Sequence, residues 1–195
     1  MTGGIASGKS SVSTTLAQLG AIIIDGDEIA HHLIEPHQPA WEEIVKVFGE
    51  DILLPDESIN RATLGAIVFN DPEQLLLLDR ITHPRVIAQV EEELRRVKSI
   101  QPEAMVVLEI PLLYEVNMDR LCDQVWVVWV DRETQINRLM TRNGFSREEA
   151  LKRIDSQMPL DEKAQRADVI IDNRGKLEET IRLATRYFND ILTKP

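Results

Sequence analysis

An α/β fold built on a parallel β-sheet is the architecture that this 195-residue sequence predicts. Four short apolar runs are each followed by a helical pattern, which is typical of buried parallel strands joined by crossover helices. Residues 3–10 fit the spacing of a loop that binds phosphate groups at the start of a helix. A chain of this length is sufficient for one globular domain, with or without insertions.

The loop at residues 3–10 reads GGIASGKS, a glycine followed by four residues and then Gly-Lys-Ser. Gly3 and Gly8 allow the backbone to approach phosphate oxygens, so that successive amide groups can face them. Lys9 would supply positive charge to the β- and γ-phosphates, and the Ser10 hydroxyl is placed to bind Mg²⁺. A Gly/Ser-rich tail without function is the alternative interpretation, which the amphipathic helical pattern after the loop makes the weaker one.

Four apolar runs are predicted to form buried strands, namely residues 21–24, 105–110, 125–130 and 169–171. An acidic residue lies at or near the end of each run: Asp25, Glu109, Asp131 and Asp172. Since ligands bind at the carboxyl ends of the strands in open α/β sheets, these side chains are expected near a binding site. Helix capping is the alternative role, and for Asp131 we favour it.

Residues 31–102 show several helical patterns and no convincing strand, so they are predicted to form a helical insert between two strands. Asp71 and Pro72 mark a helix start, as an N-cap and as a proline at the first helical position. A second helix is expected after Pro84, with His83 in an extended conformation because proline disfavours helical geometry in the preceding residue. His83 is then either a helix cap or a substrate contact.

A second excursion from the sheet is predicted over residues 132–158, as a hairpin of two helices. Gly144 should end the first helix, Ser146 and Glu149 form a capping box that begins the second, and Pro159 should end it. Helical segments at the binding edge are where a kinase holds its acceptor substrate and its lid.

Arginines recur on the faces of this predicted hairpin. Arg138 and Arg142 are four residues apart and therefore share one helix face, as do Arg153 and Gln157 on the next helix. A face with two positive charges can bind a polyanion, and solvated surface arginines are an equally good interpretation.

Composition narrows the class of protein. The net charge of −11, with acids spread along the chain, argues against binding to nucleic acid through its phosphate backbone. Cys122 is the single cysteine, the N-terminus lacks the pattern of a signal peptide, and the longest apolar runs are too short to span a bilayer. We therefore expect a cytoplasmic protein without a nucleic-acid or membrane partner.

The phosphate loop alone does not separate a kinase from a GTPase. A guanine-reading Asn-Lys-x-Asp segment is absent from the sequence, which favours a small-molecule kinase. Such an enzyme needs a carboxylate beside the acceptor hydroxyl, and Asp27 is our choice for this general base. Asp25 would bind Mg²⁺ through water or orient Asp27, and the alternative is that both cap the following helix.

Seven segments together resemble the dephospho-coenzyme A kinase family across essentially the whole chain: TGGIASGKSSVS, IIDGDEIAHHLIEP, ITHPRVI, IPLLYE, VVWVDRETQINRLMTRNG, RIDSQM and ADVIIDNRG. The resemblance implies a P-loop NTPase-type three-layer α/β fold with five parallel strands, a helical coenzyme-A-binding insert and a helical lid. It also implies ATP- and Mg²⁺-dependent phosphorylation of the ribose 3'-hydroxyl of dephospho-coenzyme A, the last step of coenzyme A synthesis. Another P-loop kinase, of the nucleoside monophosphate type, and a nucleotide-binding regulator without transfer activity are the alternatives.

The resemblance also implies roles for individual residues. Catalysis would involve Asp27, Lys9, Arg138 and Arg142, with Asp27 as the base. ATP would contact Gly4, Ile5, Ala6, Ser7, Gly8, Lys9, Ser10, Ser11, Asn173 and Gly175. Dephospho-coenzyme A would contact Asp27, His83, Pro111, Leu112, Leu113, Arg153 and Gln157, and Mg²⁺ would bind Ser10 and Asp25. The nucleotide-binding core would comprise residues 1–30, 103–135 and 165–195, the coenzyme-A-binding insert residues 31–102, and the lid residues 136–164.

Two departures from the family pattern bear on these expectations. Gly26 stands between the paired aspartates where the family usually has alanine, and this smaller residue should leave both carboxylates in place. The family's apolar strand before the loop is missing, since only Met1 and Thr2 precede Gly3. Because the neighbours of a central strand need its ladder hydrogen bonds on both sides, we expect the natural chain to start upstream of Met1.

Overall fold

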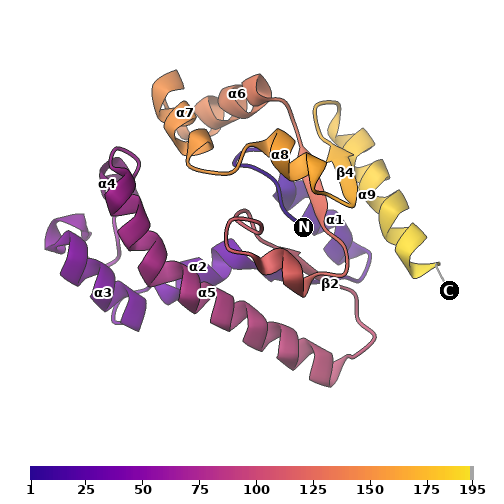
Figure 1. Ribbon diagram of the computed structural model, residues 1–195, viewed down its shortest axis with the longest axis horizontal. Helices are drawn as coiled ribbons and strands as arrows, with labels where there is room; N and C mark the ends of the chain where they lie inside the picture. The colour runs from indigo at the N-terminus through magenta and orange to yellow at the C-terminus, as the bar shows by residue number, and fades with distance from the viewer. Residues whose placement is uncertain (194–195) are drawn as a thin grey trace. The chain divides into compact units, whose positions relative to one another are not determined.

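The computed structural model describes residues 1–193, which fall into two compact units (Figure 1). Unit 1 is formed by Met1–Asp25 and by the chain from Val97 onward, and unit 2 is Gly26–Arg96. Each unit has its own hydrophobic core. The phosphate loop and the predicted lid belong to unit 1, whereas most of the predicted helical insert belongs to unit 2.

Unit 1 contains two pairs of parallel strands. The strands are β1 (Ile22–Asp25) paired with β2 (Val106–Glu109), and β3 (Trp126–Trp129) paired with β4 (Val169–Asp172). Each agrees with a predicted apolar run to within one residue at either end. The register aligns Asp25 with Glu109, so two carboxylates lie side by side at the carboxyl ends of β1 and β2.

Met1 and Thr2 join the two pairs of strands. The Thr2 amide donates to the carbonyl of Trp126 over 2.8 Å, and the Thr2 carbonyl accepts from the amide of Val128 over 2.9 Å. On the other side, the buried amino group of Met1 donates to the carbonyl of Leu108 in β2 over 2.7 Å. No strand precedes the loop in the described part of the chain, yet these two residues make hydrogen bonds in both directions, as a central strand would.

The helices of unit 1 are α1 (Lys9–Gln18), α6 (Arg132–Asn143), α7 (Arg147–Asp155), α8 (Leu160–Gln165) and α9 (Leu177–Leu192), with a short 3₁₀ helix η2 (Met118–Leu121). Of these helices, α1, α8 and α9 contact the strands, whereas α6 and α7 pack against each other. The main core joins α1 and α9 to β3 and β4, and its buried members include Val12, Leu16, Val128, Ile171 and Phe188. Together the mixed helices and parallel strands confirm the predicted α/β class.

The ends of α6 and α7 follow the predicted capping signals. The Asp131 side chain accepts from the Thr134 amide at the start of α6, and Gly144, with φ of 70°, ends that helix. Ser146 and Glu149 form the predicted capping box of α7. The expectation for Pro159 was wrong, because α7 already ends at Asp155 and Pro159 instead stands directly before α8.

Unit 2 is helical. Its elements are α2 (Gly26–Leu33), α3 (Pro39–Phe48), the 3₁₀ helix η1 (Glu50–Ile52), α4 (Arg61–Val68) and α5 (Pro72–Ile100), whose last residues continue into unit 1. Apolar side chains from α3, α4 and α5 form the core, together with those of Ile52 and Ile59. Asn60 caps α4 by accepting hydrogen bonds from the amides of Ala62 and Thr63.

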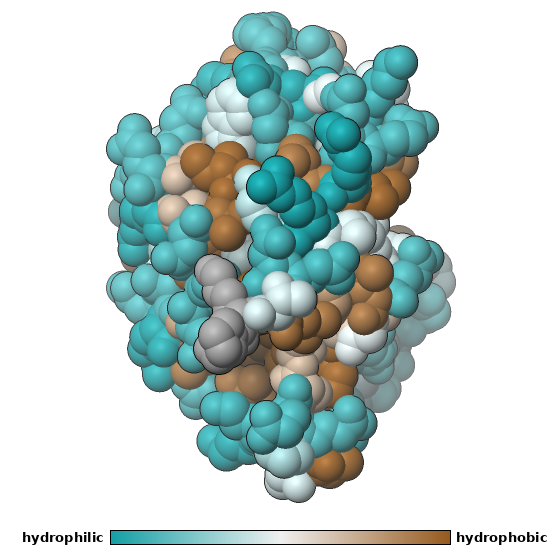
Figure 2. Space-filling view, turned by 90° about the vertical axis from the view of Figure 1, so that its right-hand side faces the viewer, coloured by the Kyte–Doolittle hydropathy of each residue, from teal (hydrophilic) through white to brown (hydrophobic). Residues whose placement is uncertain are grey.

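Polar side chains cover much of the surface, with apolar groups gathered in patches on the face shown in Figure 2. Large apolar side chains with substantial exposure include Leu76 in α5, Ile100 at its end, and Leu192 in α9. Among the described residues, no helix combines the length and the apolar character that crossing a membrane requires.

Helix α5 is one continuous helix of 29 residues, although two helices were predicted. Pro84 lies inside it and His83 is helical, so the expectation of an extended His83 was wrong. Proline disfavours helical geometry in the residue before it, but this preference is local. Here the helix continues on both sides of Pro84, and burial of Ile81 in the core of unit 2 holds this part of it in place. The Arg85 guanidinium donates to the carbonyl of Ile81 over 2.6 Å, which adds a hydrogen bond in the turn that contains the proline.

We predict that Pro84→Ala stabilises the protein, because it restores a backbone donor and removes a steric conflict in the helix interior. The free energy of unfolding should rise by about 1 to 3 kcal/mol. Urea titration followed by circular dichroism measures this change. Pro72→Ala is the matched control: Pro72 occupies the first position of α5, where proline is favourable, so that variant should gain nothing. A loss of stability in Pro84→Ala would contradict the explanation.

Candidate active site: a phosphate loop held by neighbouring helices

The phosphate loop connects Thr2 to the first turn of α1. Gly8 precedes α1 with φ of 96°, a conformation that a residue with a side chain adopts at a cost. A Cβ atom at Gly8 would also collide with the side-chain nitrogen of Asn173. Glycine is therefore required at this position by both the backbone and the neighbouring side chain.

Asn173 anchors the loop from the segment that follows β4. Its side-chain amide is buried and donates to the carbonyl of Ser7 over 2.7 Å, while its Oδ1 accepts from the Thr180 hydroxyl over 2.8 Å. The Arg138 guanidinium, from α6, donates to the carbonyl of Asn173 over 2.8 Å and to the carbonyl of Ser7 over 3.4 Å. Two predicted nucleotide-site residues and one predicted catalytic arginine thus lie together.

The peptide groups of Ile5 are held from both sides by glutamines. Gln135 in α6 donates from Nε2 to the Ile5 carbonyl, and the Ile5 amide donates to Oε1 of Gln157, each over 2.9 Å. Gly4 leaves room for Gln135, since a Cβ there would collide with its Nε2. The small core between α6 and α7 also packs against Ile5 and Ala6. The helical hairpin is therefore bound to the loop by polar and apolar contacts.

The Lys9 side chain folds back over the first residues of the loop. Its ammonium donates to the carbonyls of Gly3 over 3.2 Å and Gly4 over 3.4 Å. Ser10, in the first turn of α1, is exposed, whereas the Ser7 hydroxyl is buried and has no hydrogen-bond partner among the described residues. Backbone amides, a lysine and a helix N-terminus are the groups that bind phosphate oxygens.

Two carboxylates lie at the carboxyl ends of β1 and β2. Asp25 ends β1 beside Glu109, which is buried to 7 % exposure at the end of β2. The sequence predicts Glu109 as a strand-end acid, and its position beside Asp25 adds a second carboxylate to this edge. Asp27 is exposed in the first turn of α2, two residues after the end of β1.

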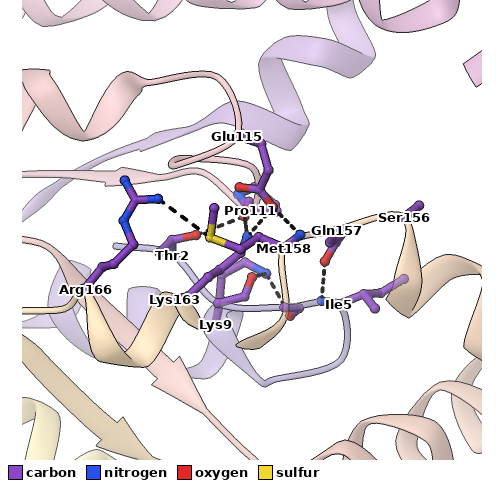
Figure 3. A network of polar contacts seen from close by, with 12 residues as sticks. Thr2, Ile5, Lys9, Pro111, Glu115, Ser156, Gln157, Met158, Lys163 and Arg166 are labelled. Atoms are coloured by element: carbon purple, nitrogen blue, oxygen red, sulfur yellow. Dashed lines mark hydrogen bonds and ion pairs between the residues drawn. The ribbon is translucent and has the colours of Figure 1, made fainter. Parts of the chain in front are cut away.

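Close to the loop, Lys163 and Glu115 form an ion pair (Figure 3). Lys163 in α8 is fully buried, and its ammonium lies 2.7 Å from Oε1 of Glu115 and donates to the carbonyl of Pro111 over 2.6 Å. The Thr2 hydroxyl donates to the same carbonyl over 2.9 Å. Burial lowers the pKa of Lys163, and the hydrogen bond and charge of Glu115 oppose this shift.

Several predicted site residues are engaged elsewhere. Arg142 is exposed and donates to the side chain of Asn143, and the guanidinium of Arg153 lies 3.9 Å from the ring centroid of Phe145. His83, in unit 2, lies 3.3 Å from a carboxylate oxygen of Asp79. The remaining ones are Leu112, which is partly buried, Leu113, which is fully buried, Ser11 in the first turns of α1, and Gly175 between β4 and α9.

Gln135 and Lys163 are the polar anchors that sequence reasoning missed. Both lie on helices whose charged and polar residues look solvated when the sequence is read alone. Gln135 had one usable signal, because it directly precedes the apolar pattern of Ile136 and Leu139 on the buried side of α6. Lys163 had none, since its partners lie 48 and 52 positions earlier in the chain.

The donor set is compatible with a bound Mg²⁺. Within residues 1–193, no group of three or more histidine, cysteine or acidic side chains could hold a metal ion. Mg²⁺ in phosphoryl-transfer enzymes needs no such cage, because one or two protein oxygens, phosphates and water complete its shell. The Ser10 hydroxyl and the carboxylates of Asp25 and Glu109 are oxygen donors of this type.

Comparison with known proteins points to one family. The family model described as dephospho-CoA kinase matches residues 1–179. A dephospho-CoA kinase of Carboxydothermus hydrogenoformans is 51% identical over 180 residues, covering 92% of this chain and 87% of the relative. One of Symbiobacterium thermophilum is 52% identical over 180 residues, covering 92% and 75%.

Solved structures show the same similarity. A dephospho-CoA kinase from Campylobacter jejuni matches with a TM-score of 0.70 and 31% identity, covering 97% of this chain and 94% of the other. A crystal structure of a Thermus thermophilus protein matches with a TM-score of 0.78 and 36% identity, covering 99% and 96%. With its phosphate loop, helical hairpin and parallel strands, the chain belongs to the dephospho-CoA kinase family.

Proposed function

We propose that this protein transfers the γ-phosphoryl group of ATP to the ribose 3'-hydroxyl of dephospho-coenzyme A. The observation that carries the proposal is the phosphate loop, which Asn173 and Gln157 hold by its backbone while Lys9 lies over it. Membership of the dephospho-CoA kinase family supports the choice of acceptor. We further propose that the reaction takes place in the cytoplasm, where ATP is available.

The loop and Arg138 would bind the phosphates of ATP. Phosphoryl transfer requires little covalent chemistry from the protein, so positioning and charge stabilisation are its main contributions. Residues 4–11 would surround the phosphates, through amides other than that of Ile5, which donates to Gln157. Lys9 would exchange its carbonyl partners for phosphate oxygens. Arg138, which already lies against Ser7 and Asn173, would stabilise charge on the transferred group, and Asn173 and Gly175 would flank the adenine.

The lid and the helical insert would contribute the remaining contacts. We propose residues 136–164 as the lid, with Arg142 and Arg153 turning from their present side-chain partners toward the phosphates and the acceptor. Residues 31–102 would bind the coenzyme A moiety, with His83 among the contacts. Pro111, Leu112, Leu113 and Gln157 would contact dephospho-coenzyme A from unit 1, and residues 1–30, 103–135 and 165–195 would form the nucleotide-binding core.

Asp27 would accept the proton of the 3'-hydroxyl and orient that hydroxyl toward the phosphorus atom. Its exposure in the first turn of α2 leaves the carboxylate accessible to a substrate. Ser10 and Asp25 would hold Mg²⁺, which when bound neutralises charge on the phosphates. Glu109 would assist as the neighbour of Asp25.

An ADP-release assay tests the proposed reaction. With ATP and Mg²⁺, dephospho-coenzyme A should support turnover, whereas AMP, adenosine and a reaction without acceptor should not. Faster release with AMP would indicate a nucleoside monophosphate kinase. Equal release in all four reactions would contradict transfer to dephospho-coenzyme A.

We predict that Asp27→Asn keeps its affinity for ATP and lowers kcat by about 10² to 10⁴, because it removes the proton acceptor and leaves the phosphate loop intact. Steady-state kinetics and calorimetric titration with ATP measure the two quantities. Glu28→Gln, on the adjacent position of α2, is the matched control and should retain its rate. An Asp27→Asn enzyme within about twofold of the wild-type rate would remove the assignment of the base.

The proposed Mg²⁺ site makes a separate prediction. EDTA should abolish turnover, and Mg²⁺ should restore it. Ser10→Ala should raise the Mg²⁺ concentration needed for half-maximal rate by about fivefold to tenfold, since one metal–oxygen contact is lost. Titration of the rate with Mg²⁺ measures this shift. Thr14→Val, which removes another exposed hydroxyl of α1 one turn further on, is the control and should leave the requirement unchanged. An unchanged requirement in Ser10→Ala would exclude this ligand.

A further inference from the structure

The ion pair of buried Lys163 and partly buried Glu115 does more than join two segments. Glu115 uses one oxygen, Oε1, to accept both from the Lys163 ammonium over 2.7 Å and from the backbone amide of Met158 over 2.9 Å. Lys163 is at the same time fixed by the carbonyl of Pro111. The pair therefore holds the backbone of the connection between α7 and α8 at a defined position.

That connection carries a contact with the phosphate loop. Gln157 immediately precedes Met158, and its Oε1 accepts the hydrogen bond of the Ile5 amide over 2.9 Å. In Figure 3, Glu115, Met158, Gln157 and Ile5 form a continuous series of dashed contacts and adjoining residues. The position of the Gln157 side chain thus depends on the backbone that Glu115 holds.

We propose that Lys163 and Glu115 are positioning residues for the phosphate loop. By fixing Met158, the pair places Gln157 on the Ile5 amide and sets the conformation of the loop that binds ATP. An effect of the pair on the KM for ATP rests on the proposed kinase function. Its effect on the Ile5 amide does not depend on that function.

Energetics favour a positioning role over a purely stabilising one. Lys163 is fully buried and the Glu115 side chain is 21% exposed. Desolvation of such charges offsets part of their attraction, so apolar residues of similar size often stabilise a protein equally well. Burial lowers the pKa of Lys163, as desolvation of an ammonium group predicts. What an apolar pair could not replace is the hydrogen bond from the Met158 amide to Glu115.

The test is a double variant, Lys163→Met with Glu115→Leu, which removes both charges together and avoids leaving one unpaired. We expect its melting temperature to remain close to that of the wild type. The exchange rate of the Ile5 amide, measured by NMR, should rise by at least about fivefold, and the KM for ATP should rise by a similar factor, as the loss of one hydrogen bond predicts. A purely structural pair would change stability without this selective effect on Ile5.

Two further variants make the test specific. Gln157→Met removes the acceptor directly and should reproduce the faster exchange of Ile5. Adding it to the double variant should cause no further increase, because both changes act through one contact. Arg147→Met with Glu133→Gln removes an exposed ion pair between α6 and α7, of 2.5 Å, and should leave the exchange of Ile5 unchanged.

The outcomes separate the two proposals. Unchanged exchange of Ile5 in the folded double variant, or effects that add to those of Gln157→Met, would overturn the positioning role. Faster exchange in an enzyme whose wild-type form does not phosphorylate dephospho-coenzyme A would uphold the positioning of the loop and refute the proposed reaction.

Discussion

The two backbone hydrogen bonds between Thr2 and β3 determine where the phosphate loop begins. They seat the chain beside Trp126 and Val128 immediately before the loop turns away from the sheet. The Thr2 hydroxyl adds a third contact, to the carbonyl of Pro111, which also accepts from Lys163. The start of the loop and the ion pair of Lys163 therefore share one carbonyl oxygen, and displacement of that peptide would disturb both.

Beyond Thr2, the loop takes its shape from side chains that lie far away in the chain. A glycine-containing loop has few conformational restraints of its own, so external hydrogen bonds must select one conformation. Asn173 holds Ser7, Gln135 and Gln157 hold the two peptide groups of Ile5, and the small core between α6 and α7 covers Ile5 and Ala6. Such preorganisation is the condition under which backbone amides bind phosphate strongly, because little ordering remains to be done on binding.

Sequence reasoning succeeded where the physical cause was local. The strands agreed to within one residue because a buried parallel strand is apolar on both faces, and the caps at Asp131 and Ser146 agreed because their partners lie three positions away. It failed at Pro84, where burial of neighbouring side chains outweighed a local conformational preference. The glycines and Lys9 of the loop could be identified from the sequence because the phosphate-loop motif is defined by their spacing.

Gln135 and Lys163, which hold the loop and its surroundings, could not be predicted from the sequence because their partners are distant in the chain. Gln135 and Lys163 have polar side chains of types that are usually solvated, and only the three-dimensional fold brings them to carbonyls more than fifty positions away. The sequence predicts Asn173 as a nucleotide contact but gives no sign that its buried side chain donates to the carbonyl of Ser7. The role of Asp27 stays a prediction, because it depends on where an acceptor hydroxyl lies.

The position of Lys9 has a consequence for the kinetics of nucleotide binding. Because its ammonium rests on the carbonyls of Gly3 and Gly4, an arriving triphosphate meets a cation that is already confined near the loop. The encounter becomes an exchange of oxygen partners around one nitrogen, so little side-chain entropy is lost at that step. Substitutions at residues 3 and 4 that shift these carbonyls should then change the association rate constant for the nucleotide more than its equilibrium affinity.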